Sequence, residues 1–146
     1  MSKPADFLPT LQALVRCYQA FESISGADVR SQGLTPPQFD IVATLGNTQG
    51  MTATELGEKT LITKGTLTGI VDRLAARGWV ERVAHDSDRR CQIIRLTPAG
   101  QALFETVFPT HMNHLATYFA GTSAADHTRW QRALHTLEQL FRKEQA

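Results

Sequence analysis

Hydrophobic residues recur every three or four positions near the start of the chain, which is the period of one face of an α-helix. Asp6 is a candidate N-cap, and Pro9 then falls in the first turn, where its missing N–H does no harm. Gly33 is a suitable end, because glycine accepts the left-handed conformation that often follows the last turn. The pattern predicts a helix over about residues 6–33, whose apolar face is formed by Phe7, Leu11, Leu14, Tyr18 and Phe21.

The middle of the chain contains three further helical segments, each opened by a threonine. Thr35 and Gln38 are spaced as a capping box, in which each side chain bonds the other residue's backbone N–H, and they predict a short helix to about residue 48. Thr52 and Glu55 have the same spacing before a helix of about two turns. Thr63 opens a longer helix, whose apolar face is formed by Leu67, Ile70, Val71 and Leu74.

After Gly78, a candidate carboxyl-terminal cap, the period changes from helical to alternating. Residues 79–84 and 90–96 alternate apolar and polar side chains, as strands do when one face is buried. Residues 85–89 between them are polar or charged and predict a turn. The segment is therefore predicted to form a two-stranded hairpin with a charged tip.

Two more helices are predicted in the last third of the chain. Thr97 and Pro98 open one that runs to about residue 120, and Pro109 inside it predicts a kink. Ser123 and Asp126 form a capping pair for the last helix. The apolar face of that helix needs a core or a partner to cover it, and it is formed by Trp130, Leu134, Leu137 and Leu140 or Phe141.

Composition indicates a soluble globular protein of 146 residues, with 42% hydrophobic and 20% charged side chains. This length fits one domain. We find no run of about 18 apolar residues and no signal-peptide pattern, so we expect a cytoplasmic protein that has no membrane partner. Cys17 and Cys91 lack metal-binding spacing, and a reducing compartment favours two free thiols.

Positive charge is concentrated in one part of the chain, although the net charge is only +1. Residues 1–58 hold three Lys or Arg against six Asp or Glu, and residues 96–146 hold four of each kind. Residues 59–95, which include the longer middle helix and the hairpin, hold eight against four, a net charge of +4. Such a local basic segment is typical of a surface that binds nucleic acid.

A short helix, a turn, a longer helix and a hairpin with a charged tip follow one another in the order of a winged helix-turn-helix. In that design the second helix enters the DNA major groove, and the hairpin, called the wing, reaches a minor groove. The outer side of residues 63–69 presents hydroxyls, a lysine and two glycines, which can contact bases or phosphates and let the backbone approach. Taken alone, this face is equally compatible with an ordinary solvated surface, and the basic segment and hairpin favour DNA.

Three stretches of the chain resemble the MarR (multiple antibiotic resistance regulator) family of bacterial transcription factors: LTPPQFDIVATL, TATELGEKTLITKGTLTGIVDRLAARGWVERV and DSDRRCQIIRLTPAG. The wing matches the family pattern at Asp88, Arg90, Leu96 and Thr97. The resemblance implies one mainly α domain over residues 1–146. It would have a winged helix-turn-helix core over about 35–97 with a small two-stranded β-wing, and dimerisation helices over about 6–33 and 98–144.

The resemblance also implies a function. We expect a homodimer that binds a near-palindromic operator in double-stranded DNA, usually as a repressor. It would dissociate from the DNA when a small molecule or an oxidant binds. Asp72 is expected to pair with a nearby arginine, and Asp88 to brace the wing loop. The expected DNA contacts are Thr54, Thr63, Lys64, Gly65, Thr66, Thr68, Arg73, Ser87, Arg89 and Arg90.

The effector is less defined by the sequence than the DNA-binding face. A pocket between the dimerisation helices and the DNA-binding part is expected, with candidate wall residues Phe21, Phe39, Phe108 and His111, and a phenolic or other aromatic carboxylate is the favoured ligand. Oxidant sensing is the alternative. Against it, Cys17 stands closer to the LTPPQ segment than the family's sensing cysteine, and Pro36 occupies the position of the partner tyrosine. Oxidation of Cys91 in the wing would disturb DNA binding directly.

Metal and enzyme readings have less support. His111 and His114 share a helical face that suits zinc, but the sequence suggests no third or fourth ligand, so we expect no metal and no cofactor. GxSxG, a phosphate-binding glycine loop, HExxH and paired carboxylates are all missing, which argues against an enzyme. A winged helix used only for protein interaction would carry apolar residues over 63–68, where this chain has Thr, Lys and Gly.

Overall fold

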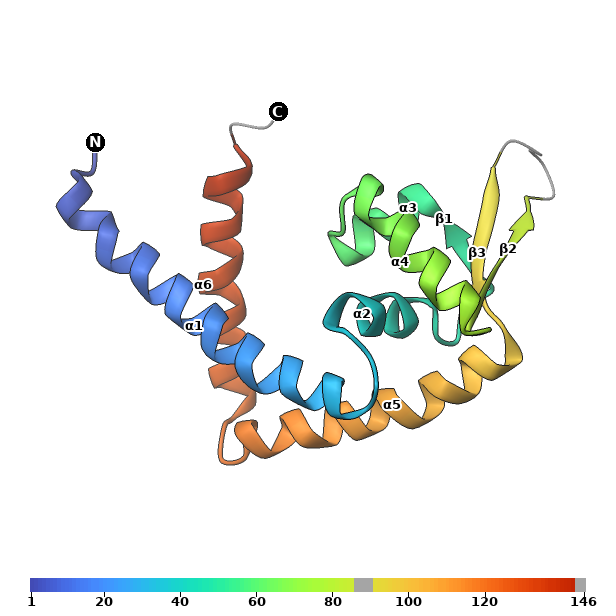
Figure 1. The fold of residues 1–146 in the computed structure, drawn as a ribbon. Helices are drawn as coiled ribbons and strands as arrows, with labels where there is room; N and C mark the ends of the chain where they lie inside the picture. The colour runs from blue at the N-terminus through green and yellow to red at the C-terminus, as the bar shows by residue number, and fades with distance from the viewer. Residues whose placement is uncertain (86–90, 144–146) are drawn as a thin grey trace. The chain divides into compact units, whose positions relative to one another are not determined.

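The chain forms six α-helices, one 3₁₀ helix and three strands over the residues that the computed structural model describes, 1–85 and 91–143 (Figure 1). The chain divides into two compact units, residues 1–114 and residues 115–146. The elements are α1 (Pro4–Ser31), α2 (Pro36–Leu45), β1 (Met51–Thr52), α3 (Ala53–Thr60), α4 (Lys64–Ala76), β2 (Val80–Ala84), β3 (Gln92–Leu96), α5 (Pro98–Ala116), η1 (Thr117–Phe119) and α6 (Ala124–Arg142).

Helix α1 begins earlier than the sequence predicted. Its first residue is Pro4, and Oδ2 of Asp6 accepts the backbone N–H of Lys3 at 3.0 Å. Asp6 is therefore the third helical residue rather than the cap, and Pro9 lies inside the helix, beyond its first turn. The end was predicted correctly, since Gly33 follows the helix with a φ of +86°.

The predicted capping box forms completely at the start of α2 and in one direction only at the start of α3, while the Thr63 side chain makes no cap bond to α4. Thr35 Oγ1 accepts the N–H of Gln38 at 3.4 Å, and Gln38 Oε1 accepts the N–H of Thr35 at 3.0 Å. The hydroxyl of Thr52 accepts the N–H of Glu55 at 3.2 Å and so caps α3. Helix α4 is followed by Gly78, whose φ is +78°. The side-chain bonds fix where α2 and α3 begin, and Gly78 marks where the chain leaves α4.

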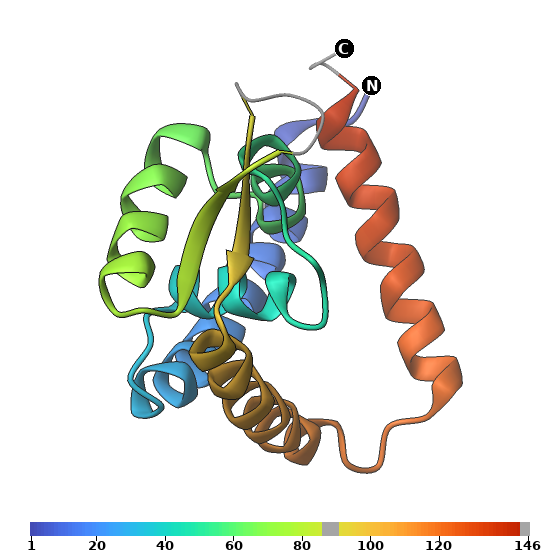
Figure 2. The same cartoon turned by 90° about the vertical axis from the view of Figure 1, so that its right-hand side faces the viewer.

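The wing is part of a small antiparallel sheet. Strands β2 and β3 pair over their whole length, with Val80 opposite Leu96 and Ala84 opposite Gln92. The two-residue strand β1, which the sequence analysis did not include, pairs with the other edge of β3, giving the order β1-β3-β2. Figure 2 shows this sheet beside α4. The hairpin is thereby anchored to the segment that precedes α3.

A single group of buried side chains holds the first unit together. The apolar face predicted for α4 is buried as expected, at Leu67, Ile70, Val71 and Leu74. Helix α2 contributes its apolar side to the same core, because hydrophobic burial is the main favourable term in folding. Other members come from α1, α3, the sheet and α5: Val29, Leu56, Val80, Ile94, Phe104 and Val107.

Residues 115–143 contain η1 and α6. Ser123 Oγ accepts the N–H of Asp126 at 3.1 Å, and Asp126 Oδ2 accepts the N–H of Ser123 at 2.9 Å, so the predicted capping pair forms. Helix α5 ends at Ala116, slightly before the predicted end, and runs through Pro109. None of the helices in the described residues is long and apolar enough to cross a membrane.

Candidate nucleic-acid interface

The residues expected to read DNA lie together on the outer side of α4. Thr63, Lys64, Gly65, Thr66 and Thr68 are all exposed, whereas the opposite face of the helix is buried. The hydroxyl of Thr63 donates to Oγ1 of Thr66 at 3.0 Å. The hydroxyl of Thr68 donates to the carbonyl oxygen of Lys64 at 3.4 Å. The first turn of α4 is thus a small, polar and locally ordered surface that a DNA groove can approach closely.

Two further expected contacts extend this surface. Thr54, in the first turn of α3, is exposed and borders the same cavity as Lys64 and Thr68. Arg73 is exposed farther along α4. The structure therefore places Thr54 beside the start of α4, although Thr54 and Thr63 are nine positions apart in the sequence.

Asp72 pairs with an arginine, as the sequence analysis expected, and the partner is Arg82 of β2. The Nη2 atom of Arg82 lies 2.7 Å from Oδ1 of Asp72. Their side chains are 29% and 60% exposed, so water and salt weaken the pair. Its value is geometric, because it connects α4 directly to the first strand of the wing.

A second arginine supports the end of α4. The guanidinium of Arg77 lies 3.9 Å from the centre of the Trp79 ring, and its Nη1 donates to the carbonyl oxygen of Gly33 at 3.3 Å. Cation–π contacts of this kind favour a fixed position of the cation over the ring. Arg77 thereby links the end of α4 to the segment that follows α1.

A cavity of about 390 Å³ lies between α3, α4 and the wing. Two cations border it, Lys64 and Arg82. The remaining lining residues are Thr52, Ala53, Thr54, Leu67, Thr68, Val71, Cys91, Gln92 and Ile94. We call this space the helix–wing cavity. Sequence reasoning did not find it, because its walls come from three separate segments.

The other face of the sheet carries a second cavity, of about 450 Å³, lined by Gln49, Gly50, Val83, Ala84, His85, Ile93 and Arg95. Arg95 on this face pairs across the strands with Glu81, with Nε 2.8 Å from Oε1. The two faces of the wing thus each carry one arginine–carboxylate pair. The tip residues expected to contact DNA or brace the loop, Ser87, Asp88, Arg89 and Arg90, lie outside the described residues.

Three of the four candidate effector-pocket residues meet in the first unit. The Phe39 ring lies 4.7 Å from the His111 ring, edge to face, and 6.5 Å from the Phe108 ring, nearly parallel. His111 is only 3% exposed. Phe21, the fourth candidate, lies on α1 with a side chain that is 47% exposed. The three rings form one aromatic cluster between α2 and α5, in which Phe39 and His111 are buried.

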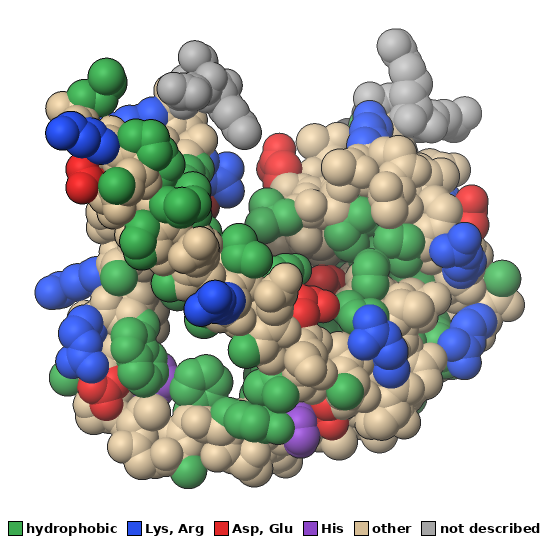
Figure 3. Space-filling model, turned by 60° about the vertical axis from the view of Figure 1, so that its left-hand side comes forward, with side chains coloured by type: hydrophobic (Ala, Val, Ile, Leu, Met, Phe, Trp, Pro, Cys, Tyr) green, Lys and Arg blue, Asp and Glu red, His purple; other side chains and the backbone are tan. Residues whose placement is uncertain are grey.

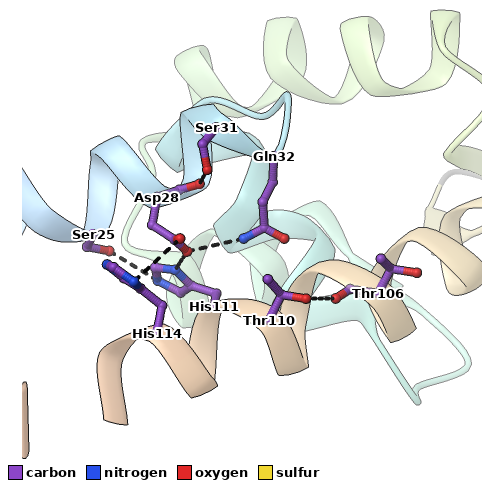
Figure 4. A network of polar contacts seen from close by, with 8 residues as sticks. All are labelled: Ser25, Asp28, Ser31, Gln32, Thr106, Thr110, His111 and His114. Carbon is purple, nitrogen blue, oxygen red and sulfur yellow. Dashed lines mark hydrogen bonds and ion pairs between the residues drawn. The ribbon is translucent and has the colours of Figure 1, made fainter. Parts of the chain in front are cut away.

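His111 is also the centre of a polar network between α1 and α5 (Figure 4). Its Nδ1 lies 2.6 Å from Oδ2 of Asp28, and its Nε2 lies 3.2 Å from the hydroxyl of Ser25. Gln32 donates to the same Oδ2 of Asp28 at 3.2 Å, and His114 Nδ1 lies 3.9 Å from its Oδ1. In the part of the chain that the structure describes, no three His, Cys, Asp or Glu side chains are arranged to hold a metal ion. His111 and His114 face a carboxylate instead.

Asp40 on α2 lies in the electrostatic field of this network. Desolvation by the surrounding protein raises the pKa of Asp40, and the negative charge of Glu22 raises it further. The charge of His111 acts in the opposite direction and lowers it. Asp40, Glu22 and His111 come from three different helices, so the charges of α1, α2 and α5 are coupled at this point.

Comparison with known proteins agrees with this architecture. The sequence model of the MarR family matches residues 34–92. The uncharacterized HTH-type transcriptional regulator YsmB of Bacillus subtilis (strain 168) is 27% identical over 143 residues, which cover 97% of this chain and 98% of that protein. The HTH-type transcriptional regulator PecS of Dickeya dadantii (strain 3937) is 31% identical over 108 residues, which cover 72% of this chain and 65% of PecS.

Solved structures have the same fold. BpsR of Bordetella bronchiseptica aligns with a TM-score of 0.76 at 25% identity and covers 89% of this chain and 98% of its own. AbsC, a MarR family transcriptional regulator from Streptomyces coelicolor, aligns with a TM-score of 0.83 at 22% identity over 92% of this chain and 93% of its own. The fold is thus a winged helix-turn-helix flanked by further helices. Residues 34–92 are a MarR family domain, and the curated relatives that match the chain are HTH-type regulators of transcription, not enzymes.

Proposed function

We propose that the protein works as a homodimer that binds a near-palindromic operator in double-stranded DNA. The observation that carries this proposal is the polar outer face of residues 63–68 beside the wing. An interaction module would present apolar side chains there, whereas these residues offer hydroxyls and a lysine to a DNA groove. A regulator of this kind acts in the cytoplasm, where the DNA is.

The exposed apolar faces of the first and last helices support the dimer. Phe7, Val15, Tyr18 and Phe21 on α1 are between 43% and 61% exposed. On α6 the exposed large side chains are Trp130, Leu134, Leu140 and Phe141. Figure 3 shows hydrophobic side chains reaching the surface. Apolar faces of this extent are typical of a protein interface, and a second copy of the chain would cover both.

In this arrangement α4 enters the major groove, with Lys64 and Thr66 contacting base edges. Thr54, Thr63, Gly65 and Thr68 approach the groove walls, and Arg73 meets the phosphate backbone. At the wing tip Arg90 enters a minor groove, which attracts arginine when it is narrow, while Asp88 braces the loop. Ser87 and Arg89 add backbone contacts. A twofold dimer places the two half-sites about one helical turn apart, roughly 10 base pairs.

We also propose that the protein is a repressor and that a phenolic or other aromatic carboxylate releases it from DNA. The proposed contacts are the aromatic cluster of Phe39, Phe108 and His111, whose flat rings would stack on a planar ligand that opens the cluster, and Phe21 as the fourth contact. DNA binding by BpsR of Bordetella bronchiseptica is regulated by 6-hydroxynicotinic acid, and NadR was solved in complex with 4-hydroxyphenylacetate. Both of those ligands are phenol-like acids.

Selection of bound sequences from a random pool of DNA duplexes tests the proposal. The expected result is one consensus with twofold symmetry, and a set of aromatic carboxylates is then screened for release of that duplex. Failure to enrich any sequence would contradict DNA reading, and a consensus without twofold symmetry would contradict the dimer. Oxidant sensing is the alternative. It would be favoured if peroxide released the DNA and Cys17→Ser, a change of an exposed thiol on α1, prevented the release.

A further inference from the structure

The helix–wing cavity includes polar side chains of the wing, Arg82 and Gln92, that have been given no DNA contact so far. Arg82 and Gln92 of the wing and Cys91 beside it face Lys64 and Thr54 across the space. Lys64 and Arg82 are cations, and none of the described residues that line the cavity is acidic. Asp72 is not among the lining residues, and it accepts one of the five N–H groups of Arg82. The cavity therefore suits an anion.

Strand register determines which wing side chains enter the cavity. Side chains alternate between the two faces of a strand, so Gln92 and Ile94 point to one face and Ile93 and Arg95 to the other. Arg82 pairs with Ile94 across the strands and shares its face. The two cavities agree with this alternation. Arg82, Gln92 and Ile94 line the helix–wing cavity, whereas Ile93 and Arg95 line the cavity on the opposite face.

The position of the cavity indicates which anion it takes. In the proposed binding mode α4 occupies a major groove and the wing reaches the adjacent minor groove. One sugar–phosphate backbone separates these two grooves, so that backbone must pass between α4 and the wing. The helix–wing cavity lies between these same elements and is lined by exposed residues of each, among them Thr54, Lys64 and Gln92. A phosphate of the backbone would therefore pass beside it.

We propose that the helix–wing cavity seats one phosphate of the operator backbone, held by Arg82, Gln92 and the hydroxyl of Thr54 beside the positive charge of Lys64, and that the seated DNA covers Cys91. This inference rests on the DNA-binding mode proposed above. The guanidinium and the amide supply N–H donors to phosphate oxygens, and Thr54 supplies an O–H. The site makes one face of the wing, with Arg82 on β2 and Gln92 on β3, a binding surface in addition to the tip.

A pair of matched substitutions tests the seat. Gln92→Glu places a carboxylate in the helix–wing cavity, and Gln49→Glu makes the same change in the cavity on the other face of the sheet. Affinity for the selected duplex is expected to fall about tenfold or more in Gln92→Glu, with the loss shrinking as salt is raised, because the repulsion is screened. Gln49→Glu is expected to bind within about twofold of the unchanged protein. Equal losses in the two variants, or none in Gln92→Glu, would overturn the proposal.

The two thiols give an independent measurement on the unchanged protein. Cys91 and Cys17 are both exposed, and Cys17 lies on α1, away from the helix–wing cavity. Alkylation by iodoacetamide is followed at each cysteine by peptide mass spectrometry, with and without saturating duplex. Alkylation of Cys91 is expected to slow about tenfold or more in the complex while that of Cys17 stays the same. Unchanged alkylation of Cys91, in a sample shown by gel retardation to be bound, would overturn the proposal. A lack of retardation would instead contradict the proposed function.

Discussion

The Nδ1 atom of His111 on α5 lies 2.6 Å from Oδ2 of Asp28 on α1, and both side chains are largely buried, at 3% and 13% exposed. The hydroxyl of Ser25 faces the other ring nitrogen. Since a hydroxyl both donates and accepts, Ser25 can satisfy His111 whether or not Nε2 carries a proton. The contact connects a proposed dimerisation helix to the helix that follows the wing, so its geometry affects how the first unit is assembled.

We expect His111→Ala to lower the free energy of unfolding by about 2–3 kcal/mol. The Asp28 carboxylate loses its hydrogen bond to the imidazole, and a space opens beside Phe39. Denaturant unfolding monitored by circular dichroism measures this loss. His135→Ala is the control, because the His135 side chain is 69% exposed. Its Nδ1 lies 3.8 Å from Oε2 of Glu138 in the same helix, which is a weak contact. A loss below about 0.5 kcal/mol in His111→Ala would show that the network contributes little.

Asp40 is expected to produce an unusual pH dependence of stability. Desolvation raises the pKa of Asp40, so the folded state holds this proton more tightly than the unfolded chain. The stability linked to this group is present below the ordinary Asp pKa of about 3.9 and is lost as the pH rises through the raised value. The melting temperature of Asp40→Asn should therefore exceed that of the unchanged protein near neutral pH. The difference should be small because Asp40 is exposed, and it should vanish near pH 3.

Asp126 provides the opposite control for that experiment. The backbone and hydroxyl of Ser123 and then Arg129 lower the pKa of Asp126. Its contribution to stability is therefore present above the ordinary Asp pKa and is lost as the pH falls through the lowered value. Asp126→Asn should melt below the unchanged protein near neutral pH, and the difference should vanish in acid. If both variants shifted in the same direction, these assignments of the two pKa shifts would be wrong.

The proposed dimer is tested on α6. Leu134 is 56% exposed, so Leu134→Asp is expected to leave the helix intact and to place a charge in the interface. Analytical ultracentrifugation at micromolar concentration should show the unchanged protein as a dimer and Leu134→Asp shifted toward monomer. Thr136→Asp is the matched control, since residues two apart do not share a helical face. An unchanged protein that is monomeric at that concentration would refute the dimer.

The prediction for the wing tip comes from the sequence alone, because Arg90 lies outside the described residues. A hairpin cannot bury four charged residues cheaply, so the tip must face solvent or DNA. Arg90→Ala is expected to weaken operator binding by about 1–3 kcal/mol and to reduce its salt dependence, with no change of base preference. Lys64→Ala should instead alter the selected consensus. An unchanged affinity and salt slope for Arg90→Ala would mean that the tip is only a solvated turn.

Sequence analysis predicted those features that local chemistry determines. Thr35 and Gln38 stand three residues apart, so their reciprocal caps follow from spacing alone. The start of α1 was misplaced because a carboxylate near a helix start suits either the cap or the third position, and only the structure shows that Asp6 bonds Lys3. Strand β1 has two residues, too few for an alternating pattern to appear.

For contacts between distant segments, the sequence predicted the type of contact but not which residue is the partner. The sequence analysis expected an arginine beside Asp72, yet Arg77, Arg73 and Arg82 are all near it in the chain, and only the packing of α4 against β2 selects Arg82. The Asp28–His111 pair spans 83 positions and leaves no mark on local spacing. The helix–wing cavity is of the same kind, since its walls are brought together by the fold.

The two arginine–carboxylate pairs on opposite faces of the wing allow a final comparison. Arg82→Gln and Arg95→Gln each remove one positive charge and one exposed pair, with Asp72 and Glu81 respectively, so each should change the free energy of unfolding by no more than about 1 kcal/mol. Only Arg82 connects the wing to α4 and borders the helix–wing cavity. Fluorescence anisotropy with the selected duplex is therefore expected to show about tenfold weaker binding for Arg82→Gln and less than about threefold for Arg95→Gln. Equal losses would mean that the wing contributes through its total charge rather than through the Asp72–Arg82 connection.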